Sequence, residues 1–355
     1  MRIVAVGGQR ILQPITIDAP EGNSMQWMIY GAKGYTGELI AREAAASGAT
    51  PILAGRSADK IAPLAQELGL SHRVFGLADA ARVAEQLGDV GLVLHCAGPF
   101  SATSAPMIEG CLAAGAHYLD ISGEIQVFEH AHAQGARARE AGVVLCPGVG
   151  FDVIPTDCLA LTLKQALPDA THLALGFDSR SGFSPGTAKT SVEGLADGGR
   201  VRRNGEITRV PLAWRTRTID VGDGEKLAMT IPWGDVSTAF YSTGIGNIEV
   251  YLPGSPRLIK QAQRANYVRW LLGLGPIQRM LKRRVERSVR GPDAETRARQ
   301  PTYVWGEARN AAGRTATARV RTANGYSLTV SGALAISRYL MENSVEGGAY
   351  TPAML

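Results

Sequence analysis

The sequence predicts an α/β protein whose first domain is a doubly wound parallel sheet of the Rossmann type, followed by an α+β domain built on a largely antiparallel sheet. Short apolar runs alternate with amphipathic helical patterns between residues 26 and 146, which is typical of a parallel sheet covered on both faces. After about Phe177, strand-like runs separated by glycine and proline follow instead. At 355 residues the chain is long enough for two such domains.

Hydrophobic periodicity assigns each element of the first domain. Strands are expected at 26–30, 51–54, 73–75, 91–96, 118–120 and 143–146, and helices at 36–47, 60–68, 80–87, 105–114 and 126–140. A last helix at 331–341 is expected to pack back on this domain. We therefore divide the chain into an N-terminal extension (1–24), a first domain (25–170) to which 331–355 returns, and a second domain (171–330).

Two regions are less regular. Residues 1–24 begin with a strand-like run that ends in two glycines, but no third glycine follows and Pro14 would interrupt the next helix. We expect this extension to have no catalytic function, and Met25 is an alternative start. Near the other end, Ala312-Gly313 and Asn324-Gly325 are typical of tight hairpin turns and predict three strands between residues 302 and 330.

Composition excludes several classes of protein. The four cysteines form no C-x-x-C pair and the six histidines have no metal-ligand spacing, so we expect reduced thiols and no metal site. No apolar run approaches the roughly 20 residues of a membrane helix, and no secretory signal is evident. These patterns predict a cytoplasmic protein and leave peripheral attachment to a membrane open.

The stretch from Tyr30 to Ala41, YGAKGYTGELIA, carries the strongest motif. Gly31, Gly34 and Gly37 follow an apolar strand and open a helix, which is the context of a dinucleotide-binding loop. Gly31 permits the tight turn, Gly34 a close approach of phosphate, and Gly37 the packing of helix on strand.

The end of the next strand decides which dinucleotide is bound. NAD-binding folds place an acid there, whereas this chain has Arg56 and Ser57. A guanidinium matches the 2′-phosphate of NADP(H), and Lys33 and Lys60 add positive charge. The sequence therefore predicts NADP(H). The cofactor-binding candidates of these two loops are Gly31, Ala32, Lys33, Gly34, Tyr35, Thr36, Gly37, Arg56 and Ser57.

Several motifs together support a family resemblance. YGAKGYTGELIA, LAGR, HCAGPF, HYLDISGE and PGVGFDVIPTD resemble the saccharopine dehydrogenase-like oxidoreductases. The later GPDAETR, GYSLT and GGAYTPA make the chain most similar to the trans-acting enoyl reductase branch of that family. The resemblance runs from about Met25 to the C-terminus, and its motifs are more specific in the first domain than in the second.

Three further segments follow strands at the edge of the sheet where doubly wound folds bind ligands. They are Ala97-Gly98-Pro99-Phe100, the DISGE segment with Asp120, Ser122 and Glu124, and Gly150-Phe151-Asp152. The resemblance implies that all three line the nicotinamide side. We assign the first to cofactor binding and the third to substrate binding.

Reduction of an enoyl thioester needs a polarised carbonyl and a proton for the α-carbon, in addition to the hydride. Asp120, Ser122 and Tyr118 are the catalytic candidates, with His117 as an alternative. Asp and Ser after a strand are also common turn formers and helix caps, so a purely structural role remains open for each.

The positive charge of the chain is local. Ten lysines and arginines stand against one acid, Glu286, between Arg257 and Arg290, so this segment carries +9 and the rest of the chain −4. A uniformly basic nucleic-acid-binding protein is therefore not predicted. Ile277, Leu281 and their neighbours recur at helical spacing, which predicts an amphipathic helix. The helix covers the second domain, docks an acidic acyl carrier protein, or contacts an anionic membrane.

Three functions remain open. The first is an NADPH-dependent reductase of an acyl or enoyl intermediate, free or carrier-bound, in lipid or polyketide assembly. The second is a saccharopine-type dehydrogenase that reduces an imine, for which arginines such as Arg180, Arg200, Arg202 and Arg203 would have to converge on the cleft. The third is a non-catalytic, NADPH-responsive docking protein. A homodimer is compatible with each.

Overall fold

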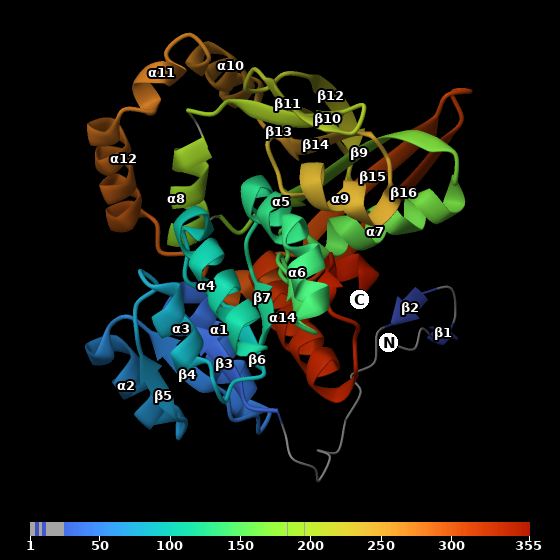
Figure 1. The fold of residues 1–355 in the computed structure, drawn as a ribbon. Helices are drawn as coiled ribbons and strands as arrows, with labels where there is room; N and C mark the ends of the chain where they lie inside the picture. Colours follow the sequence, from blue (N-terminus) through green and yellow to red (C-terminus); the bar gives the residue numbers. More distant parts are fainter. Residues whose placement is uncertain (1–3, 7–8, 12–24, 183, 195) are drawn as a thin grey trace.

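The structure, a computed structural model, describes residues 4–6, 9–11, 25–182, 184–194 and 196–355 (Figure 1). Most of the N-terminal extension lies outside the described residues, so its expected lack of catalytic function stays a prediction. Two short strands of the extension, β1 (Val4–Val6) and β2 (Gln9–Ile11), form an antiparallel pair.

The first domain is built on a seven-stranded sheet in which every described pairing is parallel. Its order is β17-β8-β7-β6-β3-β4-β5. The strands are β3 (Trp27–Tyr30), β4 (Ile52–Gly55), β5 (His72–Val74), β6 (Leu92–His95), β7 (His117–Asp120), β8 (Val144–Cys146) and β17 (Gly348–Ala349). The sequence predicted all of these except β17, which is only two residues long. The doubly wound fold is confirmed.

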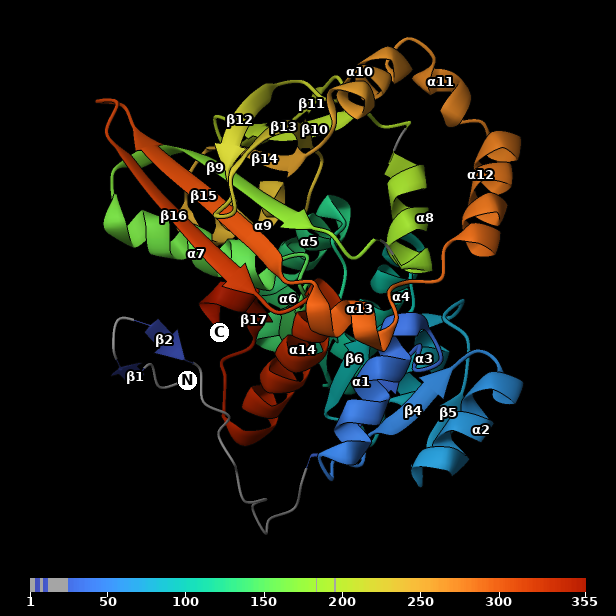
Figure 2. The ribbon, with the colours of Figure 1, turned by 180° about the vertical axis from the view of Figure 1, so that it is seen from behind.

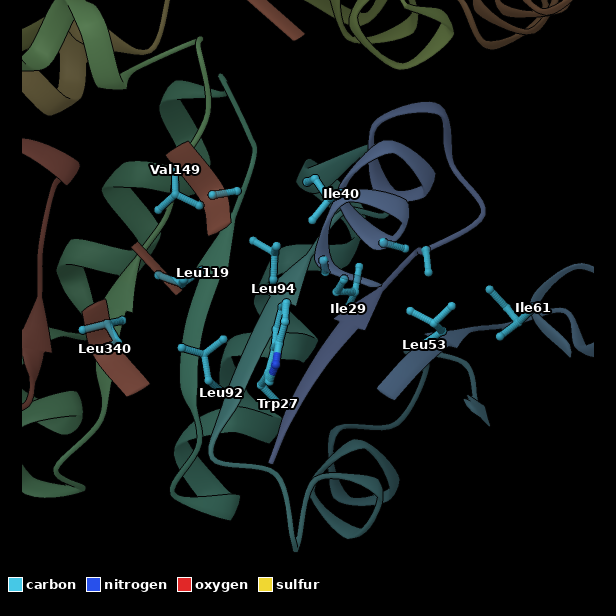
Figure 3. Packing of buried hydrophobic residues seen from close by; sticks show 14 of the residues in the cluster. Trp27, Ile29, Ile40, Leu53, Ile61, Leu92, Leu94, Leu119, Val149 and Leu340 are labelled. Carbon is cyan, nitrogen blue, oxygen red and sulfur yellow. The ribbon is translucent and has the colours of Figure 1, made fainter. Parts of the chain in front are cut away.

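Helices cover both faces of this sheet. They are α1 (Tyr35–Ala46), α2 (Ala58–Leu68), α3 (Ala80–Gln86), α4 (Phe100–Ala114), α5 (Ile125–Ala133), α6 (Gly135–Glu140) and α14 (Gly325–Glu342). Figure 3 shows the core on one face, where Ile29, Leu53 and Leu94 of the strands meet Ile40 of α1 and Leu340 of α14. The C-terminal helix thus packs on the first domain.

The second domain is an eight-stranded sheet in which β14 and β9 form the one parallel pairing among the described strands. Its strands are β9 (Ala170–Ser179), β10 (Gly199–Arg203), β11 (Glu206–Val210), β12 (Thr216–Asp220), β13 (Glu225–Ile231), β14 (Asn247–Pro253), β15 (Thr302–Asn310) and β16 (Thr315–Thr322). This largely antiparallel sheet confirms the predicted α+β domain.

Two helices, α7 (Ile154–Ala166) and α9 (Asp235–Thr243), cover one face of the second sheet. Leu159 and Leu163 of α7 pack with Leu173 and Leu175 of β9 in a single buried cluster. The periodic pattern did not assign α7. Although it precedes residue 170, where we placed the domain boundary, it contributes its apolar side to the second domain.

The predicted third strand near residue 330 is wrong. Asn324-Gly325 begins α14 instead of closing a hairpin, because the Asn324 side chain accepts a hydrogen bond from the Tyr326 N–H at 3.0 Å and so caps the helix. The helix predicted at 126–140 is likewise divided, with α5 ending at Ala133 and α6 beginning at Gly135.

Four helices of the second domain lie off its sheet: α8 (Pro185–Gly194), α10 (Pro256–Ala265), α11 (Arg269–Leu272) and α12 (Gly275–Ser288). Figure 2 shows α10, α11 and α12 following one another along the outer margin of the molecule, with α12 beside α8. A short helix, α13 (Ala294–Arg299), then leads back toward α1, and a 3-10 turn, η1 (Pro352–Met354), ends the chain.

Candidate active site

The candidate site lies at the carboxyl edge of the first sheet, where the strand order reverses between β3 and β6. The loops after these two strands touch. A Cβ added to Gly31 would lie 2.7 Å from the Ala97 nitrogen, and φ of Gly31 is +84°, so only glycine fits this turn. The glycine loop and the Ala97–Phe100 segment therefore form one surface.

The glycine loop fits a bound pyrophosphate. Gly34 is exposed and directly precedes the first turn of α1. No side chain caps this helix, so its first backbone N–H groups are left without a side-chain acceptor and can bind a phosphate. A Cβ on Gly37 would lie 2.4 Å from the Gly31 carbonyl oxygen. The roles that spacing gave to these glycines agree with this geometry.

The other side chains of the loop differ from one another. Lys33 donates to Glu38 at 2.8 Å on the surface. Tyr35 turns away, because its hydroxyl donates to the Pro292 carbonyl at 2.5 Å and accepts from Arg297 at 3.0 Å. The Tyr35 side chain thus ties the loop to the second domain, whereas its backbone N–H lies at the start of α1. Ala32 is buried and Thr36 is half-buried.

Arg56 is exposed at the end of β4 and forms no ion pair within the described part of the chain. Ser57 follows it as the residue before α2, and its carbonyl accepts from the N–H groups of Lys60 and Ile61. An exposed, unpaired guanidinium at this place fits the 2′-phosphate of NADP(H). NADPH binding would place its pyrophosphate over Gly31–Gly37 and would supply a hydride.

The segment from Ala97 to Phe100 is held in place from both sides. Thr103 of α4 donates to the Ala97 carbonyl at 2.7 Å and to that of Pro99 at 3.0 Å. The Glu124 carboxylate accepts from the N–H groups of Phe100 at 3.1 Å and Ser101 at 2.7 Å. A carboxylate that caps α4 fixes the loop that faces the glycine turn.

Asp120 and Tyr118, two of the catalytic candidates, are fully buried. The Tyr118 hydroxyl donates to Asp120 Oδ2 at 2.6 Å, and the N–H groups of Ser122 and Gly148 donate to Oδ1 at 2.9 and 2.8 Å. Burial raises the pKa of Asp120, and these donors oppose that rise. Because the carboxylate is enclosed by its own loops, this geometry favours a positioning role for both residues, and their catalytic role stays an untested prediction. Ser122 is 1% exposed, so it too lies beneath the surface.

Asp152 follows the neighbouring strand β8 and has the opposite environment. It is partly exposed, and no hydrogen bond to its carboxylate is described. A Cβ added to Gly123 would lie 2.9 Å from Asp152 Oδ2, so the carboxylate faces the loop after β7. Burial raises its pKa to about 7. An acid with this pKa can give and take a proton at neutral pH.

Tyr326 of α14 lies beside the glycine loop. Its ring meets the Tyr35 ring edge-on, with centroids 5.2 Å apart, and its hydroxyl accepts from the Ser184 N–H at 2.5 Å. Burial is the main cause of the raised pKa of Tyr326, and the negative charge of Asp152 also raises it. Tyr326 thus contacts the glycine loop through Tyr35, and Asp152 is close enough for its charge to act on the Tyr326 hydroxyl.

An aromatic wall stands behind Asp152. The Phe151 and Phe177 rings are 5.5 Å apart and the Phe177 and Trp233 rings 4.8 Å apart. The Trp233 indole N–H donates to the Asp152 carbonyl at 2.8 Å. Gly150 packs on Thr329, where a Cβ would lie 3.0 Å from its methyl carbon. The segment 150–152, predicted to bind substrate, thus sits where the domains meet.

Sequence reasoning missed two parts of this arrangement. Tyr326 belongs to a motif that we used for the family resemblance alone, and nothing in the spacing placed it near Asp152. The second part is α8, whose Thr190 lies 3.4 Å from Glu124 and whose preceding residue, Ser184, holds Tyr326. The sequence of α8 carries no motif that could have predicted these contacts.

Fold and site together are those of a Rossmann domain whose ligand edge is covered by a second, mostly antiparallel domain. Residues 27–146 match the family model described as the saccharopine dehydrogenase NADP binding domain. The first domain thus matches the NADP-binding domain of saccharopine dehydrogenases, which confirms the resemblance and the predicted cofactor, NADP(H).

Two relatives carry related names. A saccharopine dehydrogenase-like oxidoreductase from Rattus norvegicus is 32% identical over 211 residues, which cover 52% of this chain and 49% of the rat protein. A protein of Mycobacterium tuberculosis, named as a proposed trans-acting enoyl reductase, is 29% identical over 188 residues, covering 48% of this chain and 44% of that protein. The chain thus matches about half the length of these relatives.

A solved structure resembles both domains. Saccharopine dehydrogenase (L-Glu forming) from Saccharomyces cerevisiae has a TM-score of 0.60 with this chain and 10% sequence identity, over 93% of this chain and 94% of the yeast protein. At this identity the likeness shows the fold alone. It confirms the predicted fold, in which a parallel sheet domain is combined with a second, mostly antiparallel domain.

Proposed function

We propose that the chain is an NADPH-dependent reductase of an acyl or enoyl thioester in lipid or polyketide assembly. One observation carries the proposal. Asp152, an acid whose pKa is raised to about 7 by burial, lies at the carboxyl edge of an NADP-binding sheet, and its carboxylate faces Gly123 in the loop after β7. The name of the mycobacterial relative favours the enoyl substrate.

Asp152 supplies the proton in this reaction. Bound NADPH, held by the glycine loop, would supply the hydride for the β-carbon of the double bond. The protonated Asp152 carboxyl gives its proton to the α-carbon, so that the double bond is reduced to a single bond, and the Asp152 carboxylate then regains a proton from water. Below a pH of about 7 the acid is mostly protonated and able to donate.

The surroundings of Asp152 favour a thioester over an imino dicarboxylate. Such a dicarboxylate calls for arginines at the cleft, but the four candidates of the second domain are engaged elsewhere. Arg202 is 4% exposed and binds Glu129 at 2.7 Å, and Arg180 pairs with Asp178 and Asp223. Arg203 stacks over Trp214, and Arg200 donates to the Asp197 carbonyl at 2.9 Å.

Trp233, the partly exposed ring of the aromatic wall, could contact an apolar chain, whereas Phe151 and Phe177 are buried in the core. An imine-reducing dehydrogenase therefore stays the second candidate. It is supported by the match to the saccharopine dehydrogenase NADP binding domain and by the fold that the chain shares with yeast saccharopine dehydrogenase.

The test is a parallel assay of NADPH oxidation by the purified chain. One series contains enoyl thioesters of increasing chain length, and the other contains an amino acid with a keto acid, which form an imine in solution. We expect turnover with the thioesters that increases with chain length. Turnover of the imine alone would select the second candidate, and NADPH binding without turnover on either series would select the docking protein.

A further inference from the structure

The helices α10, α11 and α12, residues 256–288, form a unit that we call the arm. Half of the twelve large apolar side chains exposed on the described chain belong to it. Tyr267 is 84% exposed, Trp270 67% and Met280 60%, and Leu258, Val268 and Leu274 are each more than 40% exposed. Aromatic side chains this exposed lose the favourable burial of roughly 1.5–3 kcal/mol each, so a partner is expected to cover them.

The arm is anchored to the second domain and is not an unpacked tail. Ile259 of α10 is buried against Met229 and Ala213. At the other end, Lys282 of α12 pairs with Glu193 of α8 at 2.5 Å, and the Gln278 amide donates to the Val192 carbonyl at 3.1 Å. The exposed aromatics are therefore presented by helices whose other side is fixed.

Cationic side chains lie on α10, the helix that precedes these aromatics. Arg257, Lys260 and Arg264 recur at helical spacing on α10 and line an open groove of about 400 Å³. No ion pair of these three is found in the part of the chain that the structure describes. The arm offers unneutralised positive charge next to Tyr267 and Trp270, which its own domain does not balance.

The aromatics also project from a corner of the molecule. In both views α10 and α11 lie at the outer end of the second domain, away from the first sheet (Figures 1 and 2). Tyr267 lies between the two helices and Trp270 on α11 itself. A protein partner is normally met by a contiguous patch with a closely packed centre. Single aromatics on a protruding, cationic corner instead suit the head-group region of a bilayer.

We propose that the arm docks the protein on an anionic lipid surface. Tyr267 and Trp270 enter the head-group region, and Arg257, Lys260 and Arg264 face lipid phosphates. Each basic side chain near such a surface contributes about 1 kcal/mol, which screening by salt reduces. This inference concerns binding alone and does not depend on the proposed reductase activity.

The experiment is cosedimentation of the purified chain with two kinds of vesicle: phosphatidylcholine alone, and phosphatidylcholine in which about one lipid in three is phosphatidylglycerol. We expect binding to the anionic vesicles, weakened by salt. The double variant Tyr267→Ser, Trp270→Ser should weaken it about tenfold or more. A triple variant, Arg257→Gln, Lys260→Gln, Arg264→Gln, should lose the preference for phosphatidylglycerol. Tyr339→Ser, at a 41% exposed tyrosine of α14, is the matched control and should bind as the parent does.

Three results would overturn the proposal. Absence of vesicle binding by the parent chain is the first, and undiminished binding by the double variant is the second. The third is that something other than lipid covers the arm, while no vesicle binding is seen. The parent chain could be a dimer in size-exclusion chromatography that becomes a monomer in the double variant. Alternatively, the parent could be retained on an immobilised acyl carrier protein while the triple variant is not.

Discussion

Asp120 and Asp152 follow two neighbouring strands of the same sheet, and burial raises the pKa of both. Their surroundings differ in every other respect. Asp120 is fully buried and receives hydrogen bonds from Tyr118, Ser122 and Gly148, whereas Asp152 is partly exposed and no partner of its carboxylate is described. Position at the ligand edge therefore does not assign a role. In this account, an acid whose carboxylate oxygens already accept hydrogen bonds from the protein has a supporting role, whereas an acid without such donors is able to react with substrate.

The largest effect is expected from Asp152→Asn. If the comparison is correct, loss of the proton donor should lower the rate of NADPH oxidation with an enoyl thioester by about 10²–10⁴-fold. NADPH affinity, measured by fluorescence titration, should stay the same, because the substitution leaves the glycine loop untouched. A rate within threefold of the parent would mean that the open acid is not the donor.

Asp120→Asn should have its main effect on stability. The amide oxygen can still accept from the two backbone N–H groups. The amide NH₂, however, would face the Tyr118 hydroxyl, which donates its hydrogen to the native carboxylate, so that two donors would meet. We expect the free energy of unfolding to fall by about 2–3 kcal/mol, measured by urea denaturation. Asp152→Asn at the same pH serves as the control and should not lower stability. Equal losses in both variants would remove the distinction between the two acids.

The sequence predicted the half of the site that local chemistry specifies. Gly31 and Gly37 could be assigned from spacing, because their backbone contacts arise within one strand–turn–helix unit. Arg56 could be placed at the end of β4 because that strand has a fixed position in the fold, and its contact with the 2′-phosphate stays a prediction. The parallel sheet was predictable for the same reason, since each of its strands and helices has its own periodic pattern.

The other half depends on contacts between distant segments. Ser184 and Tyr326 are 142 residues apart, and the hydrogen bond that joins them follows from how two domains pack. Asn324-Gly325 satisfies both a hairpin turn and a helix cap, and only the burial of α14 against the first domain decides between them. Asp120 and Asp152 look alike in sequence. The sequence does not show that the carboxylate of Asp120 is bound by several donors, because one of them, the Gly148 N–H, comes from a distant loop.

The cofactor loop offers a third, smaller effect. Arg56→Glu should weaken NADPH binding by about tenfold, because it places a carboxylate where the guanidinium meets the 2′-phosphate. NADH affinity should change little, so the preference between the two cofactors narrows. Arg321→Glu, the same change of charge at an exposed arginine of β16 in the second domain, is the matched control. An unchanged preference in the Arg56 variant would show that the phosphate pocket lies elsewhere.

The smallest effect concerns the pH dependence of stability. The pKa of Asp152 in the folded protein, about 7, lies above its usual value near 3.9, so its protonated form stabilises the fold. That contribution is fully present below about pH 4 and is lost as the pH rises through 7. Relative to Asp152→Asn, the parent should therefore lose stability between pH 4 and 8, by about 1 kcal/mol after allowance for its partial exposure. Parallel stability curves for the two proteins would contradict a raised pKa.

The most direct test of the account is the pH dependence of the reduction itself. The rate of NADPH oxidation by the parent chain with a saturating enoyl thioester should be constant at low pH and fall above an apparent pKa near 7, as Asp152 loses its proton. In Asp152→Asn that transition should be absent from the residual rate. The same transition in both proteins would show that another group donates the proton, and that the contrast between Asp120 and Asp152 does not decide the chemistry.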